Sequence, residues 1–158
     1  MDSATRIDVR LANEAWESVM SAHSTLMQVF EAEHMWSEIS MREYDVLYTL
    51  SKHDKPIRMC DVQGGVLLSQ PALSRMVDRL ATRGLIAREP DPEDGRAVLL
   101  SLTADGAALQ EQVGRAHAKS IARHLGAALT ADEMHELRRI AGKLAGKTAS
   151  NLAGAPAN

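Results

Sequence analysis

The residues of this 158-residue chain best suited to chemistry are short polar and cationic side chains between positions 69 and 96. Gln70, Ser74 and Arg75 can hydrogen-bond with the base edges that a DNA major groove exposes. Arg96 is a further cationic side chain, in a segment whose two prolines and glycine are turn residues. The sequence contains no glycine-rich phosphate loop, nucleophile elbow or His-Glu-x-x-His pattern. These residue types favour DNA binding over catalysis, and we do not expect an enzyme.

A helix that begins at Gln70 is predicted to position these side chains. Ser69 is a suitable N-cap, because its hydroxyl can accept a hydrogen bond from the first turn. Pro71 fits within that turn, where its missing N–H costs nothing. Apolar residues recur at helical spacing on the opposite face, at Leu73, Met76, Val77 and Leu80. Gly84 is predicted to end the helix as its C′ residue.

A β-hairpin is predicted to follow this helix. Its strands are expected at residues 85–89 and 97–102, joined by a turn that contains prolines and a glycine. Because Pro90 has no N–H to donate, the first strand is expected to end before it. Arg96 would lie near the hairpin tip, and Asp94 would hold its guanidinium through a bidentate ion pair.

The chain's charge requires that any DNA contact be local. The net charge is −3, which is not typical of a protein that binds nucleic acid without sequence preference. Between residues 69 and 88 there are four arginines and one aspartate, so a small cationic patch is predicted. The hairpin also carries Glu89, Asp91 and Glu93, which would repel phosphate unless they are paired.

Taken together, these residues resemble a known family. The segment LSQPALSRMVDRLATRGLIARE, followed by DGR at 94–96 and LSLT at 100–103, is similar to the winged helix-turn-helix signature of the MarR family of transcriptional regulators. The similarity extends from about residue 43 to residue 106. It implies a mainly α fold (an α+β winged helix-turn-helix), with about six helices and a two-stranded wing. It also implies a homodimeric regulator of transcription, commonly a repressor and sometimes an activator, which a small aromatic or anionic effector often releases from double-stranded DNA.

The predicted organisation has four parts. Residues 1–35 supply an N-terminal helix, from residue 7 to about residue 33, and residues 36–103 supply the winged helix-turn-helix region. Residues 104–148 supply two helices, and residues 149–158 a tail that we expect to be disordered. Helix starts are predicted at the capping residues Ser40, Thr103 and Thr130. The terminal helices carry more apolar surface than a winged helix can cover, so we expect them to form a dimer interface.

The first helix of the helix-turn-helix is expected at residues 59–66. Gly64 and Gly65 lie near its end, where they cost on the order of 1–2 kcal/mol of helix propensity. A short or mobile helix is therefore predicted. Such a helix would hold the following helix less rigidly and would lower DNA affinity.

Most of the candidate DNA-binding residues lie on the helix that begins at Gln70, and Arg96 resembles the family's wing arginine, which reaches into the minor groove. Base-edge readout is assigned to Gln70, Ser74 and Arg75, with apolar contact from Pro71. Arg79 is equally well explained by a phosphate contact or by a solvated surface position. A dimer would place two such helices about 34 Å apart, so an inverted-repeat operator is expected. The full set is Ser69, Gln70, Pro71, Ser74, Arg75, Arg79, Asp94 and Arg96.

An effector site is expected on the first two helices, because family ligands commonly lie between the dimer helices and the winged domain. The candidates are Arg10, Trp16, His23, Met27 and Tyr44. Arg10 could meet the carboxylate of an anionic aromatic ligand. Core packing also explains Trp16, His23 and Met27, so both interpretations stay open for those residues.

Two further functions are alternatives. Cys60 lies at a predicted helix start beside Arg58, and both features favour a reactive thiolate, whereas Asp61 opposes it. Redox-responsive regulation through Cys60 is therefore one alternative, and a winged-helix module that binds a protein is the other. None of the six histidines forms an i, i+4 pair, so no metal or other cofactor is predicted. One cysteine, a charged N-terminus and no long apolar run predict a cytoplasmic protein without a membrane span.

Overall fold

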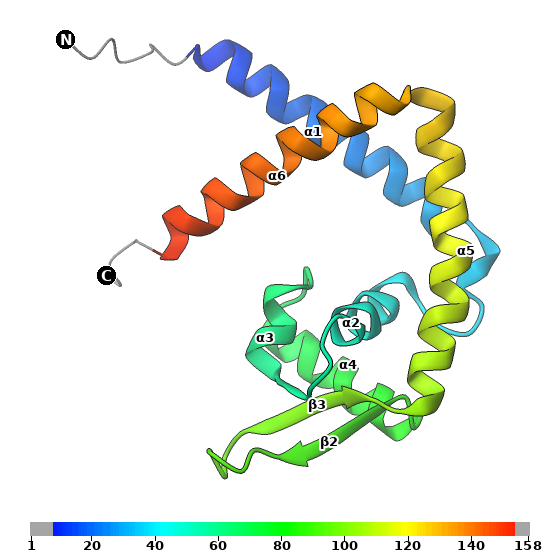
Figure 1. Ribbon diagram of the computed structural model, residues 1–158, viewed down its shortest axis with the longest axis vertical. Helices are drawn as coiled ribbons and strands as arrows, with labels where there is room; N and C mark the ends of the chain where they lie inside the picture. Colours follow the sequence, from blue (N-terminus) through cyan, green and yellow to red (C-terminus); the bar gives the residue numbers. More distant parts are fainter. Residues whose placement is uncertain (1–7, 154–158) are drawn as a thin grey trace. The chain divides into compact units, whose positions relative to one another are not determined.

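The computed structural model describes residues 8–153, with side chains described as far as residue 146. The described residues form two compact units, the first ending at His117 and the second beginning at Ala118. The first unit contains, in order, α1 (Val9–Glu31), the 3-10 helix η1 (His34–Trp36), α2 (Met41–Ser51), β1 (Ile57–Arg58), α3 (Met59–Gly64), α4 (Gln70–Thr82), β2 (Ile86–Pro90), β3 (Val98–Leu102) and the first part of α5 (Ala104–Ala128) (Figure 1). The second unit contains the rest of α5 and α6 (Ala131–Ala153). The predicted fold class is confirmed: six α-helices and a small antiparallel sheet make up the described part of the chain.

The sheet has three strands where two were predicted. The strand order is β1-β3-β2, and both pairings are antiparallel. Ile57 of β1 lies opposite Leu100 of β3. Because β1 is only two residues long, its sequence shows no alternation that could have revealed it.

The expected end of the first hairpin strand is wrong by one residue. Pro90 belongs to β2, where it lies opposite Val98. β2 is an edge strand, so the missing N–H of a proline at its end costs no hydrogen bond to a neighbouring strand.

Local capping explains where most helices begin and end. The predicted capping box of α2 is present: the Glu43 backbone N–H donates to Ser40 Oγ over 3.2 Å, and the Ser40 N–H donates to Glu43 Oε2 over 2.9 Å. Gly84 follows α4 with φ of 72°, and its N–H donates to the Ala81 carbonyl. The Leu85 N–H donates to the Leu80 carbonyl, which completes a Schellman motif.

Ser69 differs from the prediction in one respect. It occupies the N-cap position of α4 with an extended backbone, but its hydroxyl makes no capping hydrogen bond. The helix start instead rests on Pro71 in the first turn and on the burial of the α4 apolar face. The Ser69 hydroxyl is therefore available for contacts outside the helix.

Helix α3 is short, as the two glycines predicted. It ends at Gly64, and Gly65 is its C-cap residue. A Cβ atom at Gly65 would lie only 2.7 Å from the Thr49 side chain of α2, whereas nothing lies within 4 Å of a Cβ at Gly64. Gly65 is thus required by the close approach of the α3 end to α2.

The terminal helices differ in length from the predictions. Helix α1 begins at Val9, because the Asp8 carboxylate accepts from the Leu11 N–H over 3.1 Å. Helix α6 runs to Ala153, beyond the expected end near residue 147, because no glycine or proline follows Gly146 until Gly154. Part of the predicted disordered tail is therefore helical, and residues 154–158 of that tail lie outside the described residues.

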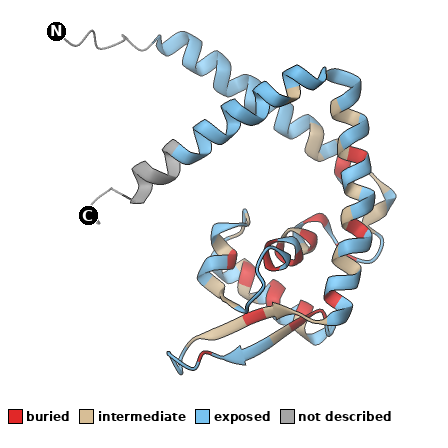
Figure 2. Ribbon diagram, viewed as in Figure 1, coloured by how far each residue is buried: buried red, intermediate tan, exposed pale blue. Residues whose placement is uncertain are grey.

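The core of the first unit belongs to the winged-helix elements. Figure 2 shows buried residues concentrated in α2, α3, α4 and the sheet, whereas α1 is exposed along most of its length. The fully buried side chains are Ile39, Val46, Leu47, Val62, Leu73, Val77, Leu80 and Leu100. Between residues 8 and 153, no helix is both long and apolar enough to cross a membrane.

Candidate nucleic-acid interface

Helix α4 presents one buried and one exposed face. Leu73, Val77 and Leu80 are completely buried in the core, which orients the helix. Gln70, Pro71, Arg75 and Arg79 are exposed, and so is Ser69 just before the helix, whereas Ser74 is half-buried. The fold therefore brings these candidate residues together on one exposed helix surface.

Ion pairs reduce the predicted cationic patch. The Arg88 guanidinium pairs with the Asp78 carboxylate. The Arg83 guanidinium donates to the Glu38 carbonyl over 2.7 Å and lies 3.4 Å from a Glu43 oxygen. Arg75 and Arg79 form no hydrogen bond or ion pair with any described residue, so these two guanidinium groups are the ones left available on α4.

The predicted Asp94–Arg96 ion pair is wrong. Asp94 Oδ1 instead accepts from the Arg96 backbone N–H over 3.1 Å, and the described residues contain no ion pair between these two side chains. An aspartate carboxylate readily accepts a hydrogen bond from the backbone N–H two residues later, and this bond is favoured here over an ion pair with the Arg96 guanidinium. Asp94 shapes the wing turn, and the Arg96 side chain stays exposed.

Asp91 explains part of the acidity of the wing. Its side chain is 5% exposed, and its Oδ2 accepts from Arg58 Nε over 2.7 Å and from Nη2 over 2.6 Å. Its Oδ1 accepts from the Glu93 N–H over 2.9 Å. The Glu93 N–H and the Arg58 guanidinium hold the pKa of the Asp91 carboxyl below its usual range. Asp91 is therefore a paired structural carboxylate, not a free charge facing DNA.

Arg58 was not among the predicted functional residues. It is the last residue of β1 and the N-cap residue of α3. Arg58 and Asp91 are 33 residues apart, so no local sequence pattern indicates that they form a pair. The available signal was the type of residue, because arginine has no acceptor with which to cap a helix start.

Cys60 is exposed in the first turn of α3. Its thiol lies 3.9 Å from Asp61 Oδ1, and the Arg58 guanidinium is bound to Asp91. The cation that the sequence predicted beside this thiol is therefore already paired with Asp91.

The predicted effector residues divide into three groups. His23 and Met27 line a cavity of about 160 Å³ between α1, α2 and the 66–68 turn that precedes α4. Trp16 is 58% exposed, and Arg10 pairs with Glu14 over 2.8 Å, so neither reaches that cavity. Tyr44 is buried in the core.

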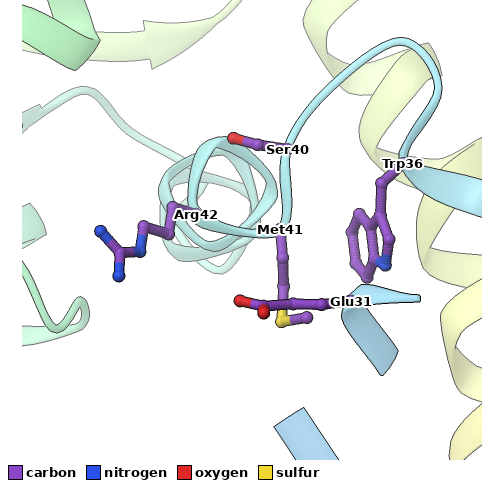
Figure 3. A pocket seen from close by; sticks show the side chains of 5 residues that line it. All are labelled: Glu31, Trp36, Ser40, Met41 and Arg42. Atoms are coloured by element: carbon purple, nitrogen blue, oxygen red, sulfur yellow. The ribbon is translucent and has the colours of Figure 1, made fainter. Parts of the chain in front are cut away.

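A second cavity adjoins the first. It measures about 360 Å³ and is lined by Glu31, Trp36, Ser40, Met41 and Arg42 (Figure 3). Glu31, Met41 and Arg42 line both cavities. Sequence reasoning missed Arg42, which lies beside the predicted capping box and lines both cavities.

Four aromatic rings, one each from α1, η1, α2 and α5, form a cluster. The His117 ring lies 5.1 Å from the Phe30 ring, 5.3 Å from Trp36 and 5.8 Å from Tyr44, each edge-to-face. His117 Nδ1 is buried without a hydrogen-bond partner. Burial lowers the pKa of His117 and raises the pKa of the nearby Asp45 carboxyl.

A helix with an exposed polar face, a preceding short helix packed against it and a hairpin with an exposed arginine define a winged helix-turn-helix protein. Comparison with known proteins agrees with this class. Residues 39–98 match the model of the MarR family. The multiple antibiotic resistance protein MarR of Salmonella typhimurium is 44% identical over 73 residues, which cover 46% of this chain and 51% of that protein. The matched region thus spans about half the length of that relative.

Two solved structures extend the likeness along more of the chain. A mutant MarR from Escherichia coli complexed with operator DNA matches with a TM-score of 0.71 and 26% identity, covering 87% of this chain and 99% of that chain. The PcaV regulator of Streptomyces coelicolor in complex with its natural ligand matches with a TM-score of 0.63 and 29% identity, covering 92% and 95%. The similarity in sequence to the MarR family therefore covers the winged-helix region of the chain, at residues 39–98.

Proposed function

We propose that this protein is a sequence-specific DNA-binding transcriptional regulator, acting as a repressor. One observation carries the proposal: α4 exposes Gln70 and Arg75 on the face opposite the core, and Arg75 is not engaged by any described residue. The likeness to a MarR structure complexed with operator DNA supports the same use of this surface. Because the proposed target is DNA, we also propose that the protein is located in the cytoplasm.

The roles of the individual residues follow from the chemistry of their side chains. Gln70 and Arg75 can read base edges through paired donors and acceptors, and Pro71 offers apolar contact to a thymine methyl. The Ser69 hydroxyl makes no capping hydrogen bond and the Arg79 guanidinium forms no ion pair with a described residue, so both can donate hydrogen bonds to phosphate oxygens. Ser74 would contact a base from a half-buried position. Arg96 would enter the minor groove beside the α4 site, on a turn shaped by Asp94.

A homodimer is the proposed assembly. Val9, Trp16 and Val19 of α1 are 69%, 58% and 50% exposed. In the second unit, Ile140 and Leu144 of α6 are 51% and 56% exposed. Apolar faces of this kind on two separate helices suit burial against a second copy of the chain. Two copies would present two α4 helices, and the operator would then be an inverted repeat.

Release by a small effector is the proposed regulation. The cavity beside His23 and Met27 includes the 66–68 turn, which leads directly into Ser69 and α4. A ligand in this cavity would touch the segment that sets the start of the recognition helix. Arg42 and His23 would receive an anionic group of the ligand, in place of the predicted Arg10. A repressor is released when the ligand binds the DNA-incompetent arrangement more tightly than the competent one.

Selection of a random duplex library by the purified full-length protein tests this function, followed by fluorescence anisotropy on the enriched duplex at several salt concentrations. We expect an enriched inverted repeat and a steep loss of affinity with salt, because Arg and Lys side chains displace counterions from phosphates. Binding that is weak, indifferent to sequence and insensitive to salt would contradict the proposal. That result would favour the protein-interaction module.

A further inference from the structure

The wing turn contains one buried residue among exposed ones. Residues 92–96 are all exposed, whereas Asp91 at the base of the turn is 6% exposed. A buried carboxylate is unfavourable unless its charge and its lone pairs are satisfied. Both oxygens of Asp91 are satisfied, Oδ1 by the Glu93 N–H and Oδ2 by the Arg58 guanidinium.

Arg58 connects this carboxylate to the helix-turn-helix. It is the residue where β1 ends and α3 begins, and β1 pairs with β3, the second strand of the wing. Its backbone N–H donates to Asp61 Oδ2 over 3.2 Å, so the main chain at this junction is held from the α3 side. Its side chain is then free to extend toward the wing, where Nε and Nη2 donate to Asp91.

Asp91 also contributes backbone hydrogen bonds to the turn that carries the exposed arginine, in addition to the bond that its carboxylate accepts from the Glu93 N–H. The Asp91 backbone N–H donates to the Ala97 carbonyl over 3.0 Å, and the Asp94 N–H donates to the Asp91 carbonyl over 3.3 Å. Asp94 in turn accepts from the Arg96 N–H. A continuous series of hydrogen bonds therefore runs from Arg58 through Asp91 and Asp94 to the backbone of Arg96.

We propose that the Arg58–Asp91 ion pair positions the wing relative to the helix-turn-helix, and so sets where Arg96 meets the minor groove while α4 occupies the major groove. This inference rests on the proposed DNA-binding function. Arg58 and Asp91 are positioning residues in it, since neither needs to touch DNA. Arg88 and Asp78 also join the wing to α4, but that pair is largely exposed and therefore worth much less.

Asp91→Asn is the sharpest perturbation, because it keeps an oxygen for the Glu93 N–H while removing the charge that binds Arg58. Arg58→Gln removes the other partner, and Arg58→Lys keeps the charge. Each variant is measured by anisotropy on a selected operator with A·T-rich flanks and on one with G·C-rich flanks. Arg115→Gln is the matched control, because it breaks an exposed pair with Glu111 on α5, away from the wing.

We expect Asp91→Asn and Arg58→Gln each to lower affinity for the A·T-flanked operator about tenfold, close to the effect of Arg96→Ala. Both should lose most of the preference for A·T flanks and keep the preference for the central half-sites. In an Arg96→Ala background the same substitutions should have no further effect. Arg58→Lys should recover part of the loss, and Arg115→Gln should bind as the wild type does.

Circular dichroism and thermal unfolding of each variant separate positioning from general stability. If Asp91→Asn does not fold, the Arg58→Lys and Arg58→Gln pair carries the test. Folded variants that keep the full flank preference, or that add to Arg96→Ala, would overturn the positioning role. A wild-type protein that selects no operator would instead overturn the proposed function, so the two failures are distinguishable.

Discussion

Adjacent glycines at the end of α3 should respond in opposite directions to the same substitution. Gly64 and Gly65 both have backbone angles that alanine can adopt, because Gly84 is the one described residue with positive φ. What differs is the space around each. A Cβ at Gly64 meets nothing within 4 Å, whereas a Cβ at Gly65 would lie 2.7 Å from Thr49 Cγ2 and 2.9 Å from Thr49 Oγ1.

The structure gives the size of both effects. Ordinary contact begins at 3.4 Å, so in Gly65→Ala the Thr49 methyl would have to move by about 0.7 Å. Thr49 is 6% exposed and its hydroxyl donates to the Asp45 carbonyl over 2.8 Å, so it cannot rotate without losing a hydrogen bond. Overpacking of this kind costs about 1–3 kcal/mol of the free energy of unfolding. Gly64→Ala should add about 0.5–1 kcal/mol, because alanine loses less backbone entropy in a helix.

Urea denaturation of the wild type and of both variants measures these changes. Gly65→Ala should have the lower midpoint and Gly64→Ala the higher one. Thr49→Ala combined with Gly65→Ala should cost less than the sum of the two single changes, because the removed side chain is the one in the way. Equal effects at the two glycines, or additive effects of the double variant, would refute the close approach between α3 and α2.

Three further outcomes are expected. Because burial lowers the pKa of His117, the unfolded chain binds more protons than the folded chain below about pH 6.5, so the free energy of unfolding should fall as the pH falls from 7 to 5. His117→Phe should flatten this pH dependence, and it also removes a buried nitrogen that has no hydrogen-bond partner. Denaturation of the wild type and the variant at several pH values measures both effects. Ile140→Glu should shift the sedimentation of the protein toward the monomer whereas Lys143→Glu on the same helix should not, and an unchanged dimer would contradict the assigned role of the α6 apolar face. Because the Cys60 thiol lies against the Asp61 carboxylate, operator binding by wild type and Cys60→Ser should respond equally to hydrogen peroxide, and a loss confined to the wild type would favour the redox alternative.

Sequence reasoning predicted the recognition helix and its termination well, because the determinants are local. The apolar spacing from Leu73 to Leu80 identified the buried face of α4. Gly84 identified its end, since only glycine readily adopts the required positive φ. The capping boxes at Ser40 and Thr130 identified two helix starts within a residue.

Features that depend on tertiary contact were missed. The strand β1 exists because Ile57 and Arg58 pair with β3, not because of their own pattern. The pairing of Asp91 with Arg58 joins segments far apart in the sequence, so the wing acidity had no local explanation. The expected Asp94–Arg96 ion pair failed because a backbone N–H was the nearer donor.

Base readout by α4 is tested most directly by parallel selections of a random duplex library with the wild type and with Arg75→Ala, with Arg79→Ala as the matched surface control. We expect the wild type to enrich an inverted repeat. Arg75→Ala should lose the preference at one position in each half-site and keep the rest, because a bidentate base contact is worth about 1–3 kcal/mol at its own base pair. Arg79→Ala should bind more weakly with an unchanged sequence preference. Identical enriched sequences from the wild type and Arg75→Ala would contradict the assignment of α4 as the helix that reads the operator.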